Sequence, residues 1–326
     1  MAKQKSWALV GSETLLGREI RELVSTPGNA IDLKLISGGE EAGTLTEQSG
    51  EAAVVTELTA LNLGTANVVF LAGTAESTRE AIKLAATSTL IDLTHAAEDH
   101  PKARLRAPMV EAPNGPIPAD AIHVIAHPAA IALAIILNRL NAIYPLKQAV
   151  IHVMEPASER GSGGIEELQQ QTVNLLSFKG LPKKVFDAQL AFNVLARYGE
   201  EAPFPLQEAE LRIERHLAPL LRHAPMPSLR LIQVPVFHGH SFSLWLEFEE
   251  NPSTEAIEQA LADEKIDVRS SGTEPPSISG IAGMSGVALG AVEVDRNRPQ
   301  ACWMWMVADS LRLAAENAIA VARQME

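Results

Sequence analysis

Short apolar runs alternate with amphipathic stretches through the first third of the chain. The runs are continuously apolar, which is typical of strands buried on both faces of a parallel sheet. A stretch with helical periodicity follows most of them, as in a doubly wound sheet with helices on both faces. The pattern predicts a Rossmann-type α/β domain. Its expected strands cover residues 7–10, 31–37, 67–73, 90–94 and 122–126.

The second part of the chain follows a different pattern. Phe242, Leu244, Leu246 and Phe248 alternate with Ser, Trp or Glu, as in a strand whose two faces meet different surroundings. We therefore expect an α+β domain with a mixed sheet. Its expected strands are 148–154, 229–237 and 241–249, and its expected helices are 165–176, 207–221 and 254–261.

These patterns give the domain boundaries. A length of 326 residues allows two domains, each large enough to bury a core. We expect the first domain at 1–128 and the second at 129–306, with an amphipathic helix at 307–326 that returns to the first. Residues 275–286, rich in Gly, Pro and Ser, predict a long loop.

Composition excludes several classes of protein. A net charge of −13 argues against non-specific nucleic-acid binding, because phosphates attract clustered Lys and Arg. Cys302 is the only cysteine, which excludes an intramolecular disulfide and any multi-cysteine metal site. We expect no metal and a cytoplasmic protein. The longest apolar run, 121–137, is shorter than the ~20 residues of a membrane span and predicts buried core instead.

A glycine turn follows the first strand. Gly11 and Gly17 lie at the ends of this turn, with Thr14 between them. Backbone N–H groups and the helix dipole at such a turn hold pyrophosphate. Glu13 opposes that role, because its carboxylate repels phosphate. Two interpretations stay open: a dinucleotide site, and a turn that only permits tight packing of strand against helix.

Several motifs occur in one order along nearly the whole chain. Residues 124–133 read Val-Ile-Ala-His-Pro-Ala-Ala-Ile-Ala-Leu, an apolar strand that passes through a proline into an apolar helix. Residues 189–193 read Gln-Leu-Ala-Phe-Asn, 233–241 read Gln-Val-Pro-Val-Phe-His-Gly-His-Ser, and 307–312 read Val-Ala-Asp-Ser-Leu-Arg. Together these motifs resemble the aspartate-semialdehyde dehydrogenase family. They are most similar to its Usg branch, which lacks the cysteine at the active-site corner.

The resemblance assigns catalytic positions. The family's cysteine attacks the aldehyde to give a thiohemiacetal, and its position here is Ala130. Glu155 stands where a glutamine orients the thiol, and His240 matches the acid/base. His240 can equally be a hydrogen-bonded loop residue. Cys302, in a run of large apolar residues, is expected to be buried and not catalytic.

The resemblance also assigns ligand-binding positions. Glu210 and Arg212 match the family's Glu-x-Lys substrate motif, and Gln233 replaces the arginine that binds the substrate carboxylate. The cofactor implied is NADP, although 37–41, Ser-Gly-Gly-Glu-Glu, offers no arginine for its 2′-phosphate. The expected cofactor-binding residues are Gly11, Ser12, Glu13, Thr14, Leu15, Leu16, Gly17, Ser37, Ala72 and Gly73.

Three functions follow from these expectations. The first is a homodimeric relative of the dehydrogenase that has lost its activity. The second is a working NADP-dependent semialdehyde dehydrogenase of amino-acid biosynthesis with a divergent site. The third is a non-enzymatic binding or assembly protein with a protein partner.

Overall fold

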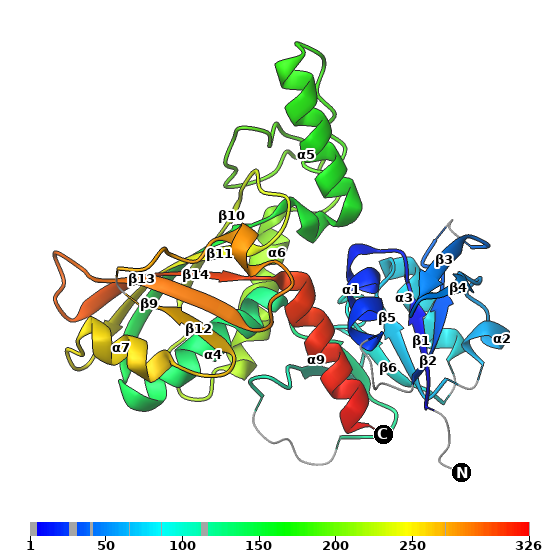
Figure 1. Ribbon diagram of the computed structural model, residues 1–326, viewed down its shortest axis with the longest axis horizontal. Helices are drawn as coiled ribbons and strands as arrows, with labels where there is room; N and C mark the ends of the chain where they lie inside the picture. The colour runs from blue at the N-terminus through cyan, green and yellow to red at the C-terminus, as the bar shows by residue number, and fades with distance from the viewer. Residues whose placement is uncertain are drawn as a thin grey trace. The chain divides into compact units, whose positions relative to one another are not determined.

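The structure is a computed structural model that describes residues 5–25, 31–39, 42–64, 66–85, 87–111, 117–270 and 272–325. Two compact units make up the chain (Figure 1). One comprises Met1–Ala126 and Ala314–Glu326, and the other His127–Leu313. Each unit contains its own six-stranded sheet. Glu40 and Glu41, at the end of the 37–41 segment, lie outside the described residues.

The first unit contains an all-parallel sheet in the order β2-β1-β5-β6-β8-β7. The strand order reverses direction at β1, which creates a switch point between β1 and β5, where doubly wound sheets place their ligands. This unit confirms the predicted Rossmann-type class. Its strands and helices are β1 Lys5–Val10, α1 Leu15–Val24, β2 Ile31–Ile36, α2 Ala60–Leu63, β5 Val68–Leu71, α3 Ala75–Leu84, β6 Thr89–Asp92, β7 Ala103–Arg106 and β8 Ile122–Ile125, with a separate hairpin of β3 Leu45–Gln48 and β4 Glu51–Val54.

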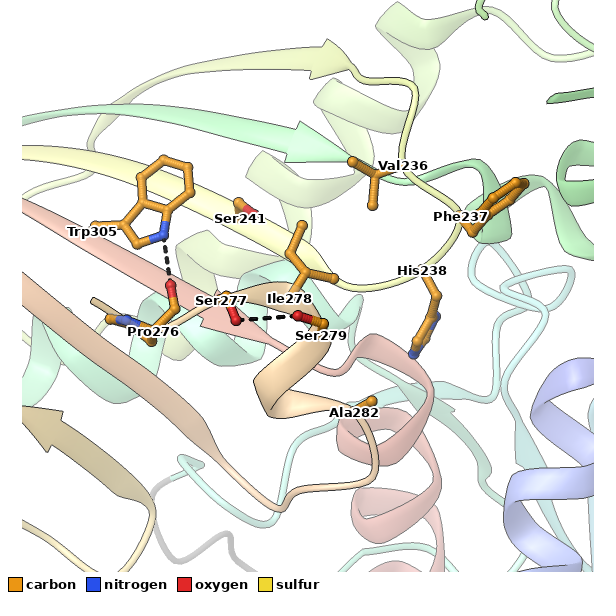
Figure 2. A pocket seen from close by; sticks show the side chains of 10 residues that line it. All are labelled: Val236, Phe237, His238, Ser241, Pro276, Ser277, Ile278, Ser279, Ala282 and Trp305. Atoms are coloured by element: carbon orange, nitrogen blue, oxygen red, sulfur yellow. Dashed lines mark hydrogen bonds between the residues drawn. The ribbon is translucent and has the colours of Figure 1, made fainter. Parts of the chain in front are cut away.

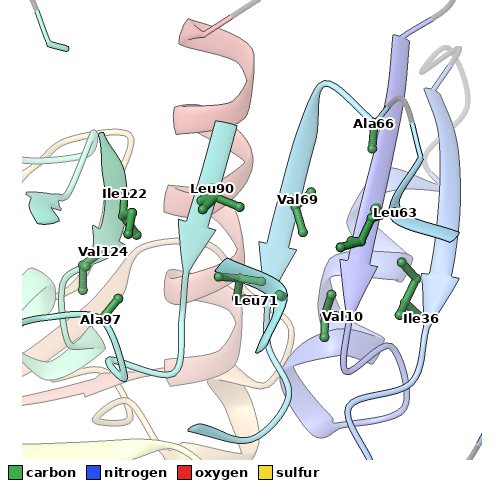
Figure 3. Close-up of a cluster of buried hydrophobic side chains, with 12 residues drawn as sticks. Val10, Ile36, Leu63, Ala66, Val69, Leu71, Leu90, Ala97, Ile122 and Val124 are labelled. Carbon is green, nitrogen blue, oxygen red and sulfur yellow. The ribbon is translucent and has the colours of Figure 1, made fainter. Parts of the chain in front are cut away.

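Aliphatic side chains from neighbouring strands form the core of the first unit (Figure 3). Val10, Val69 and Leu71 are fully buried, and Val124 is 1% exposed. Burial of this kind stabilises the fold by about 25 cal/mol per Å² of apolar surface removed from water. Because both faces of these strands are buried, apolar and polar residues do not alternate along them, as the sequence predicts.

The second unit contains a mixed sheet in the order β10-β9-β11-β14-β13-β12. Strand β9 is parallel to β10 and β12 is parallel to β13, while the other pairs are antiparallel. Helix α4 packs against β9, α6 and α7. The elements are α4 Pro128–Ile143, β9 Leu146–Glu155, the 3-10 turn η1 Ala157–Arg160, α5 Gly161–Leu176, α6 Leu206–Leu220, β10 Ser228–Gln233, β11 His240–Phe248, α7 Thr254–Leu261, β12 Ile266–Arg269, α8 Ile278–Ile281, β13 Val287–Val294 and β14 Ala301–Ala308, after which α9 Ser310–Gln324 leads into the first unit.

The alternation predicted for β11 is confirmed. Phe242, Leu244 and Leu246 are fully buried and Phe248 is 1% exposed. The opposite face places Trp245 beside Trp303 of β14. No helix in the described part of the chain is long and apolar enough to cross a membrane.

Four segments differ from the sequence-based expectation. Residues 307 and 308 belong to β14, because they pair with β11, so α9 begins at Ser310 and not at 307. Strand β10 ends at Gln233, since Pro235 has no N–H to donate to a neighbouring strand. Helix α5 begins four residues before the expected 165, and the expected loop at 275–286 contains the short helix α8.

Candidate functional site

The corner that carries Ala130 is a tightly packed helix start. His127 caps α4, its Nδ1 accepting the Ala129 N–H at 3.2 Å. Pro128 occupies the first helical position, where its missing N–H costs nothing. His216 Nδ1 accepts the His127 N–H at 2.9 Å. Ala130, in the first turn of α4, is fully buried and has no functional group.

A buried polar cluster surrounds Glu155 at the end of β9. Glu155 Oε1 accepts a hydrogen bond from Arg160 Nη2 at 2.5 Å and lies 3.3 Å from Tyr198 Oη. Complete burial raises the pKa of Glu155, and the Arg160 charge opposes that rise. Glu155, at the position predicted for a glutamine, thus has an ion-pair partner in Arg160, five residues later in the chain.

Gln233 is held inside the same cluster. Its Oε1 accepts a hydrogen bond from Tyr198 Oη at 2.5 Å, and its Nε2 donates to the Glu155 carbonyl at 2.8 Å. Gln233 is fully buried. Both polar ends of the side chain are therefore engaged by the protein, at the position that the motif match predicts for the substrate arginine.

His240 is buried without a hydrogen-bond partner. Neither ring nitrogen has one among the described residues, and its exposure is 0%. Glu159 Oε1 lies 3.9 Å from Nδ1, and the His127 ring centroid is 5.9 Å from that of His240. Burial lowers the pKa of His240 to about 4, so the imidazole is neutral at physiological pH.

Glu210 and Arg212, which match the substrate motif, lie in different surroundings. Glu210 Oε2 accepts the Leu231 N–H of β10 at 2.6 Å, so this carboxylate fixes the edge of the sheet. The Arg212 guanidinium lies 5.1 Å from the centre of the Phe204 ring, and Arg160 lies 4.9 Å from the same centre. Arg212 therefore joins the Glu155 cluster through Phe204, whereas Glu210 is occupied elsewhere.

The glycine turn in the first unit has a crowded backbone. Gly11 has a φ of +84°, and a Cβ on it would lie 2.3 Å from the Gly73 nitrogen. A Cβ on Gly17 would lie 2.1 Å from the Gly11 carbonyl oxygen. The loops after β1 and β5 therefore approach each other as closely as glycine permits, which brings Gly11 together with Ala72 and Gly73.

Thr14 fills the position of the missing middle glycine. Its hydroxyl lies 2.8 Å from the Ala72 carbonyl oxygen and 2.9 Å from that of Gly11, and it accepts the Gly17 N–H at 3.0 Å. Thr14 is thus the cap of α1, and its hydroxyl takes up an N–H group at the helix start. Leu15 and Leu16 begin the helix, and their N–H groups are of the kind that an α-helix leaves without an intrahelical acceptor.

Glu13 and Ser37 complete the predicted cofactor positions. Glu13 pairs with Arg21 at 3.2 Å and accepts a hydrogen bond from the Ser12 hydroxyl. Ser37 Oγ donates to the Gly39 carbonyl at 2.7 Å. These side chains are satisfied within the turn region itself.

The described residues offer neither a thiol in place of Ala130 nor a metal centre. Cys302 is buried in β14, and burial raises its pKa to about 12. Among the residues that the structure describes, no group of three or more His, Cys, Asp or Glu side chains could hold a metal ion.

The family assignment rests on more than half of the chain. Residues 137–313 match the family model described as semialdehyde dehydrogenase, dimerisation domain. The chain belongs to the semialdehyde dehydrogenase family. Its relatives include an aspartate-semialdehyde dehydrogenase of Rickettsia bellii, 23% identical over 333 residues that cover 100% of this chain and 98% of the relative. They also include a USG-1 protein homolog of Pseudomonas aeruginosa, 27% identical over 330 residues that cover 98% and 97%.

Solved structures agree with this family's fold. A probable aspartate-semialdehyde dehydrogenase from Pseudomonas aeruginosa matches with a TM-score of 0.85 and 26% identity, covering 99% of this chain and 98% of the other. The aspartate-semialdehyde dehydrogenase from Candida albicans, solved with NADP, shares the fold with a TM-score of 0.69 at 14% identity and covers 98% and 99%.

The site positions assigned by sequence stay predictions, and sequence reasoning missed the partners of their side chains. The sequence contains a signal for Arg160, which follows Glu155 by five residues in the turn before α5. Tyr198 and Phe204 lie in an irregular segment between α5 and α6, and no periodicity or motif connects them to β9.

Proposed function

We propose that this protein is a member of the family that has lost semialdehyde dehydrogenase activity. The observation that carries the proposal is Ala130, fully buried in the first turn of α4 at the family's nucleophile position. Alanine forms no thiohemiacetal, so an aldehyde bound there has no covalent intermediate from which a hydride could leave. Cys302 offers no substitute, because it is buried in β14.

The other members of the predicted site support the same proposal. His240 is neutral and lacks a thiol to deprotonate. Gln233 carries no charge to bind a substrate carboxylate, and Tyr198 and the Glu155 backbone already engage it. The site has thus changed at the nucleophile, at the residue that orients it and at the substrate clamp.

NADP, when bound to a dehydrogenase, accepts a hydride, but the described residues of the turn do not fit it well. The Thr14 hydroxyl occupies the Gly17 N–H, and Glu13 places a carboxylate beside the first turn of α1. Ser37 to Gly39 provide no cationic side chain for a 2′-phosphate. We therefore expect weak dinucleotide binding without a preference for NADP over NAD.

Turnover and binding test this proposal separately. The purified protein should show no NADP-dependent oxidation of aspartate semialdehyde. Millimolar NADP or NAD should raise its melting temperature only slightly, because a weakly bound ligand stabilises the folded state little. Measurable turnover would contradict the proposal. An Ala130→Cys variant should not recover more than trace activity, because Glu155 and Gln233 remain changed. Full recovery would show that the nucleophile alone was lost.

The matched dimerisation domain supports a second element of the proposal. We expect a homodimer formed through the second unit, as the description of the domain implies. Light scattering should give twice the chain mass of 35.0 kDa. A protein of this kind without dehydrogenase activity could act through binding or assembly, and a monomer in solution would remove the motive for that role.

A further inference from the structure

Three side chains beside the Glu155 cluster form a continuous hydrogen-bonded row in the second unit. Ser158 Oγ lies 3.1 Å from His238 Nδ1, and His238 Nε2 lies 2.9 Å from Asp309 Oδ1. The three residues come from separate segments: η1, the loop between β10 and β11, and the junction of β14 with α9. Ser158 and His238 are 80 positions apart, so only the fold brings them together.

The carboxylate end of the row fixes the direction of the hydrogen bonds. Asp309 also accepts the N–H groups of Arg312 at 3.0 Å and Gly283 at 2.8 Å. Burial acts to raise the pKa of Asp309, but the hydrogen bonds from His238 and from these backbone groups bring it down to about 2. Asp309 is therefore ionised at neutral pH and accepts from His238 Nε2. When His238 is neutral, its Nδ1 lone pair faces Ser158 and accepts the hydroxyl proton.

Ser158 lies at a sharp strand–turn–helix connection. Strand β9 ends at Glu155, and the 16-residue helix α5 begins at Gly161. The Ala157 N–H donates to the Val236 carbonyl at 2.8 Å, and the Ser158 N–H donates to the Phe237 carbonyl at 2.9 Å. These two bonds tie the turn to the loop that carries His238. The following helix start favours negative charge close to the turn.

His238 also borders a cavity of about 630 Å³ (Figure 2). Apolar side chains make up most of its lining, among them Phe237, Ile278 and Trp305. Ser241 lines it as well, and its hydroxyl is buried and has no hydrogen-bond partner among the described residues. A cavity that combines an apolar lining with several polar groups is typical of a small-molecule site. Ser158 is buried outside this lining and is connected to the cavity through His238.

We propose that Ser158, His238 and Asp309 form a nucleophilic site that hydrolyses small carboxylic esters, with the apolar cavity beside His238 receiving the apolar part of the ester. Ser158 Oγ attacks the carbonyl carbon while His238 Nδ1 takes the hydroxyl proton. The bond between carbonyl carbon and alkoxy oxygen then breaks, and His238 passes the proton to the leaving alkoxide. Water then attacks the acyl carbon and gives a proton to His238 Nδ1. The bond between the acyl carbon and Ser158 Oγ breaks, His238 returns the proton to Oγ, and the carboxylic acid leaves. This chemistry needs neither a thiol at position 130 nor a dinucleotide.

A fluorophosphonate probe and p-nitrophenyl butyrate test the proposal on the full chain. The probe should label Ser158, as located by peptide mass mapping. Ser158→Ala should abolish the label and lower butyrate ester hydrolysis at least about 100-fold, the range of a general base and its nucleophile. Asp309→Asn should slow the reaction while keeping the label site. Ser243→Ala, a change of a half-buried serine on β11 away from the row, is the matched control and should keep both label and rate.

A second variant gives a readout that does not depend on the ester. Ser158→Cys should be alkylated by iodoacetamide faster than Ser243→Cys, because His238 would lower the pKa of a thiol at position 158. The native Cys302 is buried and contributes little background. A wild-type protein without label at Ser158, an unchanged rate in Ser158→Ala, or equal alkylation of the two cysteine variants would overturn the proposal. If the row only connects segments of the fold, the substitutions would change the melting temperature and none of these readouts.

Discussion

The glycine turn of the first unit and the Glu155 cluster of the second both differ from the residues that the family resemblance implies, but in opposite ways. The turn keeps the residues that its backbone requires and changes a side chain. Gly11 remains where a Cβ would clash with Gly73, while Thr14 takes the middle position and bonds to the Ala72 carbonyl. The cluster changes its charges instead, and each changed residue has a partner: Glu155 has Arg160, and Gln233 has Tyr198.

The difference separates two kinds of constraint. A Cβ on Gly11 would lie 2.3 Å from the Gly73 nitrogen, so this position excludes a side chain whether or not the turn binds a cofactor. A charge in a catalytic cluster is retained only for its chemistry, but once changed it must still be satisfied in a buried site. The turn therefore reports a constraint of the fold, and the cluster holds the residues on which the proposed loss of activity rests.

The largest expected effect tests the backbone constraint. Gly11→Ala should destabilise the protein by about 3 kcal/mol or more, because it combines a positive φ with a clash against backbone that cannot move aside. Gly39→Ala is the matched control, since nothing lies within 4 Å of the added Cβ, and it should change stability by less than about 1 kcal/mol. Denaturant unfolding followed by circular dichroism measures both. Equal denaturation midpoints for Gly11→Ala and Gly39→Ala would show that the turn adjusts to accommodate the added Cβ.

The next effect tests the cluster through pH. His240 has a pKa lowered from 6.5 to about 4. The neutral imidazole therefore contributes to the free energy of unfolding above pH 6.5, and this contribution is lost as the pH falls through 4. The unfolded chain binds the proton more tightly, which gives a loss of about 3 kcal/mol over that range. His240→Asn should lack this loss. Glu155 and Glu159, whose pKa values burial raises, are present in both proteins, and Arg160 stays charged throughout. Parallel profiles of unfolding free energy between pH 7.5 and 4 would contradict the assignment.

The smallest effect returns to the turn. Thr14→Ala removes a helix cap and the hydrogen bond to the Ala72 carbonyl, and should cost about 1–2 kcal/mol. Thr14→Ser keeps the hydroxyl and should cost much less. Thermal melts of the two variants distinguish them. Equal melting temperatures for the two variants would show that the Thr14 hydroxyl does not stabilise the turn.

The sequence predicts the architecture well where a single periodicity operates. Continuous apolar runs correctly predicted the parallel sheet, and the alternation at 241–249 correctly predicted the two faces of β11. Val307 was wrongly assigned to the last helix, because an apolar residue before a helix fits either element and only its pairing with Ser241 decides. Short strands such as β7 and β12 have four residues each, too few to show a period.

The site was less predictable, because its contacts join distant parts of the chain. Motif matches located Ala130, Glu155 and His240 along the sequence, and their roles stay predictions. Nothing in the sequence connects Tyr198 with Gln233, which lie 35 positions apart, or His238 with Asp309, which lie 71 apart. Such pairs depend on the register of β9, β10 and β11, which the sequence does not specify.

The burial of Cys302 has a practical consequence. With its only native thiol only 2% exposed inside β14, the wild-type chain already serves as a nearly silent background for thiol-directed labelling. Two cysteines introduced at exposed positions, one in each unit, could carry a spin-label pair without any prior removal of native cysteines. Distances from such a pair would report how the two units move relative to each other in solution.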